Sequence, residues 1–116
     1  MYMEKGVPYA LKLINEFNIE KYRNDVSDFF ASLARFALYN DEEKSKFFQY
    51  IQKSLELNSN NIEAYEALGL YFYYYGGEEK KGKIRDLIVK VEKIDSNYSN
   101  SKGNLLYKLL SNEDLR

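Results

Sequence analysis

Residues 62–97 of this 116-residue chain read IEAYEALGLYFYYYGGEEKKGKIRDLIVKVEKIDSN. Apolar side chains recur there at steps of three and four residues, the spacing of a helix face, and no strand-like alternation is sustained. Gly76 and Gly77 interrupt the pattern, because glycine permits the left-handed backbone common at helix ends. Asp95-Ser96-Asn97 ends it, since these side chains compete for backbone hydrogen bonds. The stretch therefore predicts two helices, over about residues 62–75 and 82–94.

The same helical spacing extends to both sides of this stretch. The only proline is Pro8, so little interrupts helices farther along. Further helices are expected over about residues 8–17, from Asp25 or Ser27 to Leu38, over 42–57 and over 102–110. Asp25 and Ser27 are chosen as starts because Asp and Ser are favourable N-caps. Phe47, Phe48 and Ile51 are apolar positions of the third of these helices. The chain is therefore predicted to be all-α.

Two segments of the chain show a similar arrangement of residues. In residues 62–97, a large–x–x–Leu–Gly–x–x–aromatic spacing is followed by a second apolar helix and then by the closing segment EKIDSN. The residues that form this pattern are Tyr65, Leu68, Gly69, Phe72, Ile84, Ile88 and Val91. This segment resembles the tetratricopeptide repeat family, whose period is about 34 residues with one helix–turn–helix per repeat. Ser96 stands where the family usually has proline.

A more degenerate copy of the pattern covers residues 27–61, with Ala34 in the place of Gly69. Its other matching residues are Phe30, Leu33, Ala37, Phe47, Ile51 and Ser54. The resemblance implies a single domain built as an α-solenoid of antiparallel helix pairs, about two repeats plus flanking helices. Its parts are an N-terminal helix within 1–26, the repeats 27–61 and 62–97, and a capping helix with a tail over 98–116. Small residues such as Gly69 are expected to let the two helices of a pair approach closely. An irregular helical bundle is the alternative architecture.

The resemblance also implies a concave groove that binds a segment of a partner protein. The side chains implied to line it are Glu63, Glu66, Leu70, Tyr73 and Tyr74 in the better copy and Arg35 and Tyr39 in the degenerate one. Tyr73 and Tyr74 fit the groove and the core equally well, whereas Tyr71 and Tyr75 fit core or edge packing better. Arg35 fits a contact with a ligand carboxylate and an ion pair with Glu66 equally well.

Composition narrows the possible functions. The formal net charge is -1, which disfavours a dedicated nucleic-acid binder. The cationic stretch from Lys80 to Arg85 is interpreted as a solvated loop or helix start rather than a phosphate site. The chain has no Cys and no His, so a metal site is not expected, and general acid–base chemistry would fall to Asp, Glu, Lys or Tyr.

Sequence motifs of catalysis are absent, and acidic pairs such as Glu78-Glu79 sit where they complement a helix dipole. No apolar run approaches the roughly 18 residues of a membrane span. We therefore expect a cytoplasmic, non-catalytic protein-interaction module that needs no cofactor and binds a peptide or helix of another protein. Homo-oligomers are compatible with this expectation. The alternative function is a small inhibitor or regulatory subunit that acts through a surface patch of a helical bundle.

Overall fold

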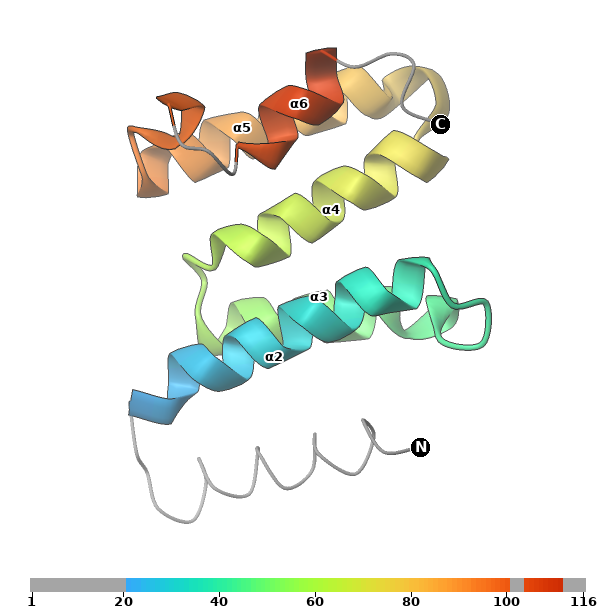
Figure 1. Cartoon of the computed structure of the whole chain (residues 1–116), viewed down its shortest axis with the longest axis vertical. Helices are drawn as coiled ribbons and strands as arrows, with labels where there is room; N and C mark the ends of the chain where they lie inside the picture. The colour runs from blue at the N-terminus through green and yellow to red at the C-terminus, as the bar shows by residue number, and fades with distance from the viewer. Residues whose placement is uncertain (1–20, 101–103, 112–116) are drawn as a thin grey trace. The chain divides into compact units, whose positions relative to one another are not determined.

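The computed structural model describes residues 21–100 and 104–111 (Figure 1). Five α-helices and three short 3₁₀ segments account for 84% of these residues, and none of them is in a strand, which confirms the all-α prediction for the described part of the chain. The helices are α2 (Lys21–Leu38), α3 (Phe47–Leu57), α4 (Ile62–Tyr75), α5 (Lys80–Ile94) and α6 (Leu105–Ser111). The helix predicted over residues 8–17 lies outside the described residues.

The chain divides into two compact units, one ending at Asn61 and one beginning at Ile62. This boundary coincides with the boundary predicted between the two repeat-like segments. We call the residues up to Asn61 unit 1 and those from Ile62 unit 2. Within unit 1, α2 packs along α3, and 3₁₀ segment η1 (Lys44–Lys46) leads into α3.

Two helix starts in unit 1 differ from the prediction. α2 is already helical at Lys21, so neither Asp25 nor Ser27 caps its start. α3 begins at Phe47 instead of near Glu42, because the intervening residues form a turn and a 3₁₀ segment, with Glu43 N–H bonded to the carbonyl of Asn40. Phe48 is 52% exposed and does not belong to the core face of α3, whereas Phe47 is buried.

A buried polar cluster joins α2 to α3. The Ser27 hydroxyl donates to the Ser54 carbonyl over 2.7 Å, and the Ser54 hydroxyl donates to the Ser27 carbonyl over 2.8 Å. The Asn61 side-chain amide donates to Ser27 Oγ at 2.8 Å and to Asp28 Oδ1 at 3.0 Å. Such groups are stable in an interior only when their hydrogen bonds are satisfied. Ser27 therefore joins two helices and is not a cap.

Unit 2 contains α4, α5 and α6, which pack against one another. Gly69 is buried on α4, and an added Cβ there would overlap Leu106 Cδ2 and lie 3.4 Å from Leu109 Cδ1. The close approach predicted at Gly69 is therefore present, but the side chains nearest to it belong to α6. The predicted pairing of this contact with the second helix of the same repeat was wrong.

The boundaries predicted in unit 2 agree well with the structure. α4 spans the predicted residues, and α5 ends at Ile94 as expected but begins two residues earlier, at Lys80. The turn between them uses Gly77 at φ 59°, a left-handed conformation that favours glycine. The Gly76 N–H closes the end of α4 by donating to the Phe72 carbonyl over 2.8 Å.

Candidate protein-interaction surface

The last turn of α4 carries the most concentrated group of exposed aromatic side chains in unit 2. Tyr74 is 42% exposed and Tyr75 is 47% exposed, and their ring centroids lie 6.5 Å apart. The Tyr71 ring lies 5.4 Å from that of Tyr75 and is half-buried. We call Tyr71, Tyr74 and Tyr75 the tyrosine surface. Its exposed members combine large apolar area with polar hydroxyl groups.

The tyrosine surface rests on a residue that is almost fully covered. Tyr73 is only 6% exposed, and its ring meets that of Tyr74 edge to face at 5.3 Å. Lys80 Nζ lies 4.7 Å from the centroid of the Tyr73 ring, a favourable position for a cation over an aromatic face. Tyr73 is thus held from two sides, and this arrangement limits the freedom of the neighbouring Tyr74.

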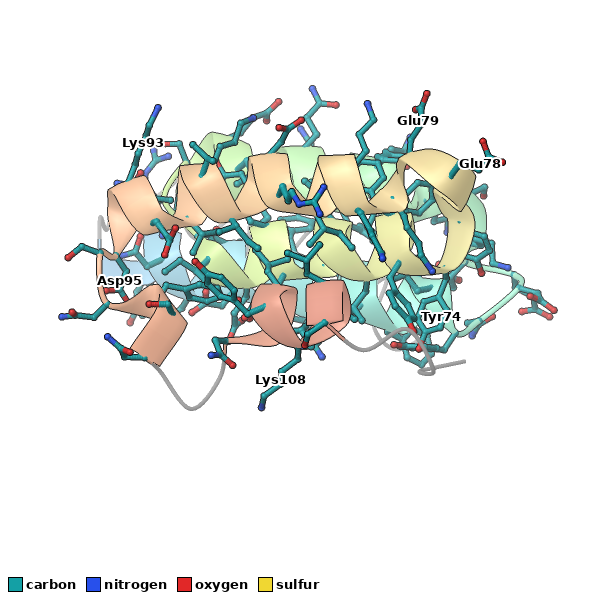
Figure 2. All side chains as sticks on the ribbon, turned by 90° about the horizontal axis from the view of Figure 1, so that it is seen from above. Tyr74, Glu78, Glu79, Lys93, Asp95 and Lys108 are labelled. Atoms are coloured by element: carbon teal, nitrogen blue, oxygen red, sulfur yellow. The ribbon has the colours of Figure 1, made fainter. Side chains whose placement is uncertain are left out.

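Two charged residues follow the tyrosine surface in the chain, after Gly76 and Gly77. Glu78 and Glu79 belong to the 3₁₀ segment η2 (Gly77–Glu79), and both are exposed. Figure 2 shows Tyr74, Glu78 and Glu79 at one end of unit 2, with Lys93 and Asp95 at the other. The sharp turn at Gly77 is what brings these carboxylates close to the end of α4.

Three of the groove residues predicted on α4 are buried. Leu70 is 4% exposed, Tyr73 6% and Glu66 9%, whereas Glu63 and Tyr74 are exposed. Tyr65, Leu68 and Phe72, which the repeat pattern assigns to the core, are only half-buried. The groove face and the core face of α4 are therefore not separated as the sequence predicted. The reason is that apolar residues occupy every side of α4, so their spacing does not define a single buried face.

The buried carboxylate of Glu66 has a structural partner set within unit 2. Its Oε2 accepts a hydrogen bond from the Tyr98 hydroxyl at 2.7 Å and one from the Leu105 N–H at 3.3 Å. The Tyr98 hydroxyl in turn accepts the N–H of Leu106 over 3.0 Å. Glu66 and Tyr98 together satisfy N–H groups that the first turn of α6 leaves without intrahelical partners. Glu66 therefore has a structural role: its carboxylate helps to hold the start of α6 in position.

Burial raises the pKa of Tyr98 well above its ordinary range, and the hydrogen bond to the nearby Glu66 carboxylate raises it further, while the hydrogen bond from Leu106 N–H opposes both. The Tyr107 hydroxyl donates to Glu92 Oε2 at 2.6 Å, and this bond is the main reason that the pKa of Tyr107 is also raised. Both tyrosines therefore hold their protons more firmly in the folded unit than in free solution.

Unit 1 has an exposed aromatic group of its own. The two predicted site residues of unit 1, Arg35 on α2 and Tyr39 in the turn after it, are both exposed, Tyr39 at 65%. Phe36 at 42% and Phe48 at 52% were not predicted as surface residues. The position of Phe36 on α2 could have identified it as exposed. Leu33 and Ala37 already form the buried face of α2, and Phe36 lies beside that face. Each unit thus exposes aromatic side chains near the end of its first described helix.

Within the described ranges, no group of three or more acidic, His or Cys side chains is arranged to hold a metal ion. In the same part of the chain, no helix combines the length and the apolar character that crossing a membrane requires. Comparisons with protein-family models, with curated proteins and with solved structures found no match.

Proposed function

We propose that this chain is a non-catalytic protein-interaction module that binds a segment of a partner protein through the tyrosine surface at the end of α4. The observation that supports this most is the exposure of two adjacent tyrosines, Tyr74 at 42% and Tyr75 at 47%. Tyrosine is enriched at binding hot spots because a ring with few rotatable bonds loses little entropy on binding and carries a hydrogen-bonding tip.

The surroundings of the tyrosine surface support the same proposal. An aromatic centre bordered by charged groups is the usual composition of an interface with a hydrophobic core and a polar rim. Glu78 and Glu79 would form part of that rim. The contacts of Tyr73 with Tyr74 and Lys80 hold part of the surface in place before binding, which lowers the entropic cost of association.

The tetratricopeptide-like architecture is part of this proposal. The helix pair α2–α3 in unit 1 and the pair α4–α5 in unit 2 would be the two repeats, and α6 would cover the end of the second. The exposed groove residues predicted from the resemblance, Glu63 in unit 2 and Arg35 and Tyr39 in unit 1, remain candidate partner contacts. We further propose that the protein acts in the cytoplasm and that its partner is another protein, not a nucleic acid.

The second candidate function is a small inhibitor or regulatory subunit that acts through a surface patch. One observation favours it: Glu66, Leu70 and Tyr73 of the predicted groove face are buried, so few groove side chains on α4 are left to contact a ligand. The exposed aromatic side chains of unit 1, Phe36, Tyr39 and Phe48, would then be the candidate contacts.

Capture of binding proteins from an extract of the native host distinguishes these candidates. The double variant Tyr74→Ala/Tyr75→Ala should lose the partners that the wild-type chain retains, as quantified by mass spectrometry, because each hot-spot tyrosine contributes about 2 kcal/mol or more on truncation. Phe48→Ala is the matched control, since it removes a comparably exposed ring from unit 1. Loss of the partners with Phe48→Ala, and their retention by the double variant, would support the patch instead.

A further inference from the structure

The outward face of α5 has features that packing among the described residues does not explain. Gly82, Asp86, Val89 and Lys93 recur at helical steps along this face, and all four are exposed. Val89 is 54% exposed although it is flanked on the helix by the buried Ile88 and Val91. The charged side chains of Arg85 and Lys90 border the same face. It is thus a charged helix surface with one exposed aliphatic side chain.

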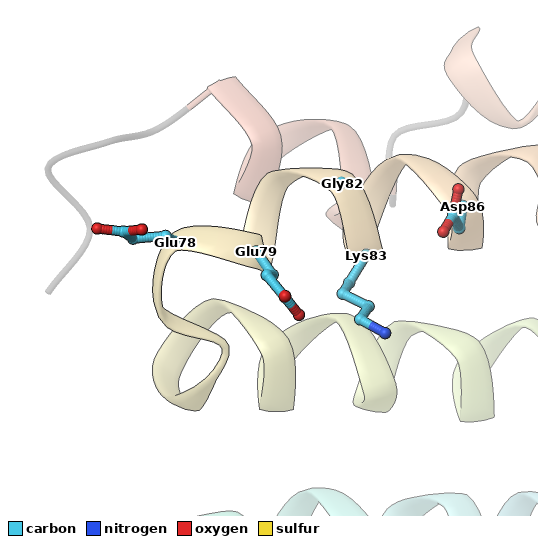
Figure 3. Close-up of a pocket in the computed structure, with 5 residues that line it drawn as sticks. All are labelled: Glu78, Glu79, Gly82, Lys83 and Asp86. Carbon is cyan, nitrogen blue, oxygen red and sulfur yellow. The ribbon is translucent and has the colours of Figure 1, made fainter.

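A shallow hollow lies on this face beside Gly82. Its volume is about 370 Å³, and its lining residues are Glu78, Glu79, Gly82, Lys83 and Asp86 (Figure 3). Glu79, the last residue of η2, and Gly82, Lys83 and Asp86 of α5 stand at positions i, i+3, i+4 and i+7. This is the spacing of the four residues that receive a side chain from a facing helix in knobs-into-holes packing. Lys83 extends from α5 toward α4, with its Nζ 5.9 Å from the Phe72 ring centroid (Figure 3).

Gly82 is what leaves this hollow open. An added Cβ at Gly82 would meet no heavy atom of residues 21–100 or 104–111 within 4 Å, so the packing of these residues does not require glycine there. Glycine in a helix is less favourable than alanine by up to about 1 kcal/mol. A residue that weakens the helix and fills no space within the chain is explained if another helix approaches closely at this point.

Lys80, Lys81, Lys83 and Arg85 place positive charge in the first half of α5, but on the outward face itself charge is distributed unevenly. Glu78 and Glu79 precede its first turn, whereas Lys90 and Lys93 lie near its end, and Figure 2 shows Glu79 and Lys93 at opposite ends of the helix. A second α5 placed antiparallel would set Glu78 and Glu79 of each copy against Lys90 and Lys93 of the other. These side chains of the outward face therefore complement those of a second copy, as a two-fold symmetric interface requires.

We propose that the outward face of α5 binds α5 of a second copy of this chain in an antiparallel pair. Val89 lies seven residues beyond Gly82, about 10 Å along the helix axis at 1.5 Å per residue. In the antiparallel pair, Val89 of each copy enters the hollow beside Gly82 of the other. Glu79 of each copy then lies level with Lys93 of the other. This inference goes beyond the proposed function, because the tyrosine surface takes no part in it.

The association is expected to depend on concentration. One helix pair buries less area than the interfaces of stable complexes, so the dimer belongs to the weak and reversible class. Its ion pairs would be exposed at the rim and weakened by salt. Sedimentation of the whole chain over a range of concentrations at low salt should therefore show a monomer that converts to a dimer, and a chain that stays monomeric throughout would overturn the proposal.

Two substitutions test whether this face forms the dimer. Val89→Glu removes the inserted side chain and Gly82→Leu fills the hollow, so each should weaken dimerisation by roughly tenfold or more. A Cβ at Gly82 meets open space and Val89 is 54% exposed, so the helical circular dichroism spectrum should stay unchanged. Dimerisation of wild-type strength in both variants would place the interface elsewhere. Partner capture through Tyr74 and Tyr75 should be unaffected, which separates a failure of this proposal from a failure of the proposed function.

Charge reversal tests the antiparallel orientation. Glu79→Lys and Lys93→Glu should each dimerise more weakly than the wild type, because each brings like charges together at both ends of the pair. An equimolar mixture of the two variants should form a heterodimer more readily than either variant dimerises alone, since all end contacts are then of opposite sign. A mixture that associates no better than the separate variants would contradict the antiparallel arrangement.

Discussion

At the scale of single residues, Gly69 shows most directly how the type of residue depends on packing, because a Cβ at this position would overlap Leu106. The sequence identifies it as a small residue at a helix contact, and the contact exists. Its partner Leu106 was not predictable, because the Leu–Gly spacing is a property of one helix and carries no information about which other helix faces it. The buried roles of Ser27 and Glu66 were missed for a similar reason, since both depend on partners distant in sequence.

Substitution of Gly69 tests this contact. Gly69→Leu should lower the free energy of unfolding by about 1–3 kcal/mol or more, because the new side chain overlaps Leu106 in a filled space. Thermal unfolding measures the change. Gly82→Leu is the matched control, as it places the same side chain in open space on a helix of the same unit. Equal melting temperatures for Gly69→Leu and the wild type would show that α6 does not pack against Gly69.

The raised pKa of Tyr98 predicts a loss of stability in alkali. Above the ordinary tyrosine pKa of 10.0, the unfolded chain releases a proton that the folded chain retains at Tyr98. The free energy of unfolding should therefore fall as pH rises beyond 10, whereas this residue's contribution is fully present below that pH. Denaturant unfolding at several pH values measures the slope.

Tyr98→Phe should make this alkaline slope shallower, because the substituted ring has no proton to lose. The variant should also be less stable at neutral pH, since Glu66 and the Leu106 N–H lose a hydrogen-bonding partner. An alkaline slope identical to that of the wild type would mean that Tyr98 is not the group whose proton is retained.

At the scale of helices, periodicity and turn residues predicted most ends correctly but not all starts. Asn58 and Asp95 end α3 and α5 at the predicted breaks, and the glycine pair ends α4. The start of α2 was misplaced because Ser27 has the chemistry of an N-cap, whereas its hydroxyl in fact bonds to α3. A serine can cap its own helix or form a buried hydrogen bond to another helix. Only the position of the second helix shows which of the two roles it has.

The polar cluster between α2 and α3 gives a prediction at this scale. Ser27→Ala and Asn61→Ala should each destabilise the chain by about 1–3 kcal/mol, because buried hydrogen-bonding groups lose partners. Ser32→Ala, at an exposed position of the same helix, should change stability by no more than about 0.5 kcal/mol. If Ser27 acted only as a helix cap, Asn61→Ala would leave the unfolding midpoint unchanged, contrary to this expectation.

At the scale of the whole molecule, the helical class of the described residues follows from the sequence. The candidate site follows only in part. The run of aromatic residues predicted a binding site at the end of α4. It did not predict which rings are buried, because consecutive residues on a helix point in different directions. Tyr73 proved buried and Tyr75 exposed, whereas the repeat pattern favoured packing for Tyr75.

The most direct test of the proposed binding surface is site-specific photo-crosslinking in the native host. A photoreactive phenylalanine analogue replaces Tyr74 in one chain and Phe48 in another, both exposed aromatic positions. We predict a discrete crosslinked partner from position 74, suppressed by the additional substitution Tyr75→Ala, and no such product from position 48. Crosslinks from position 48 alone, or identical products from both positions, would contradict the assignment of the tyrosine surface as the binding site.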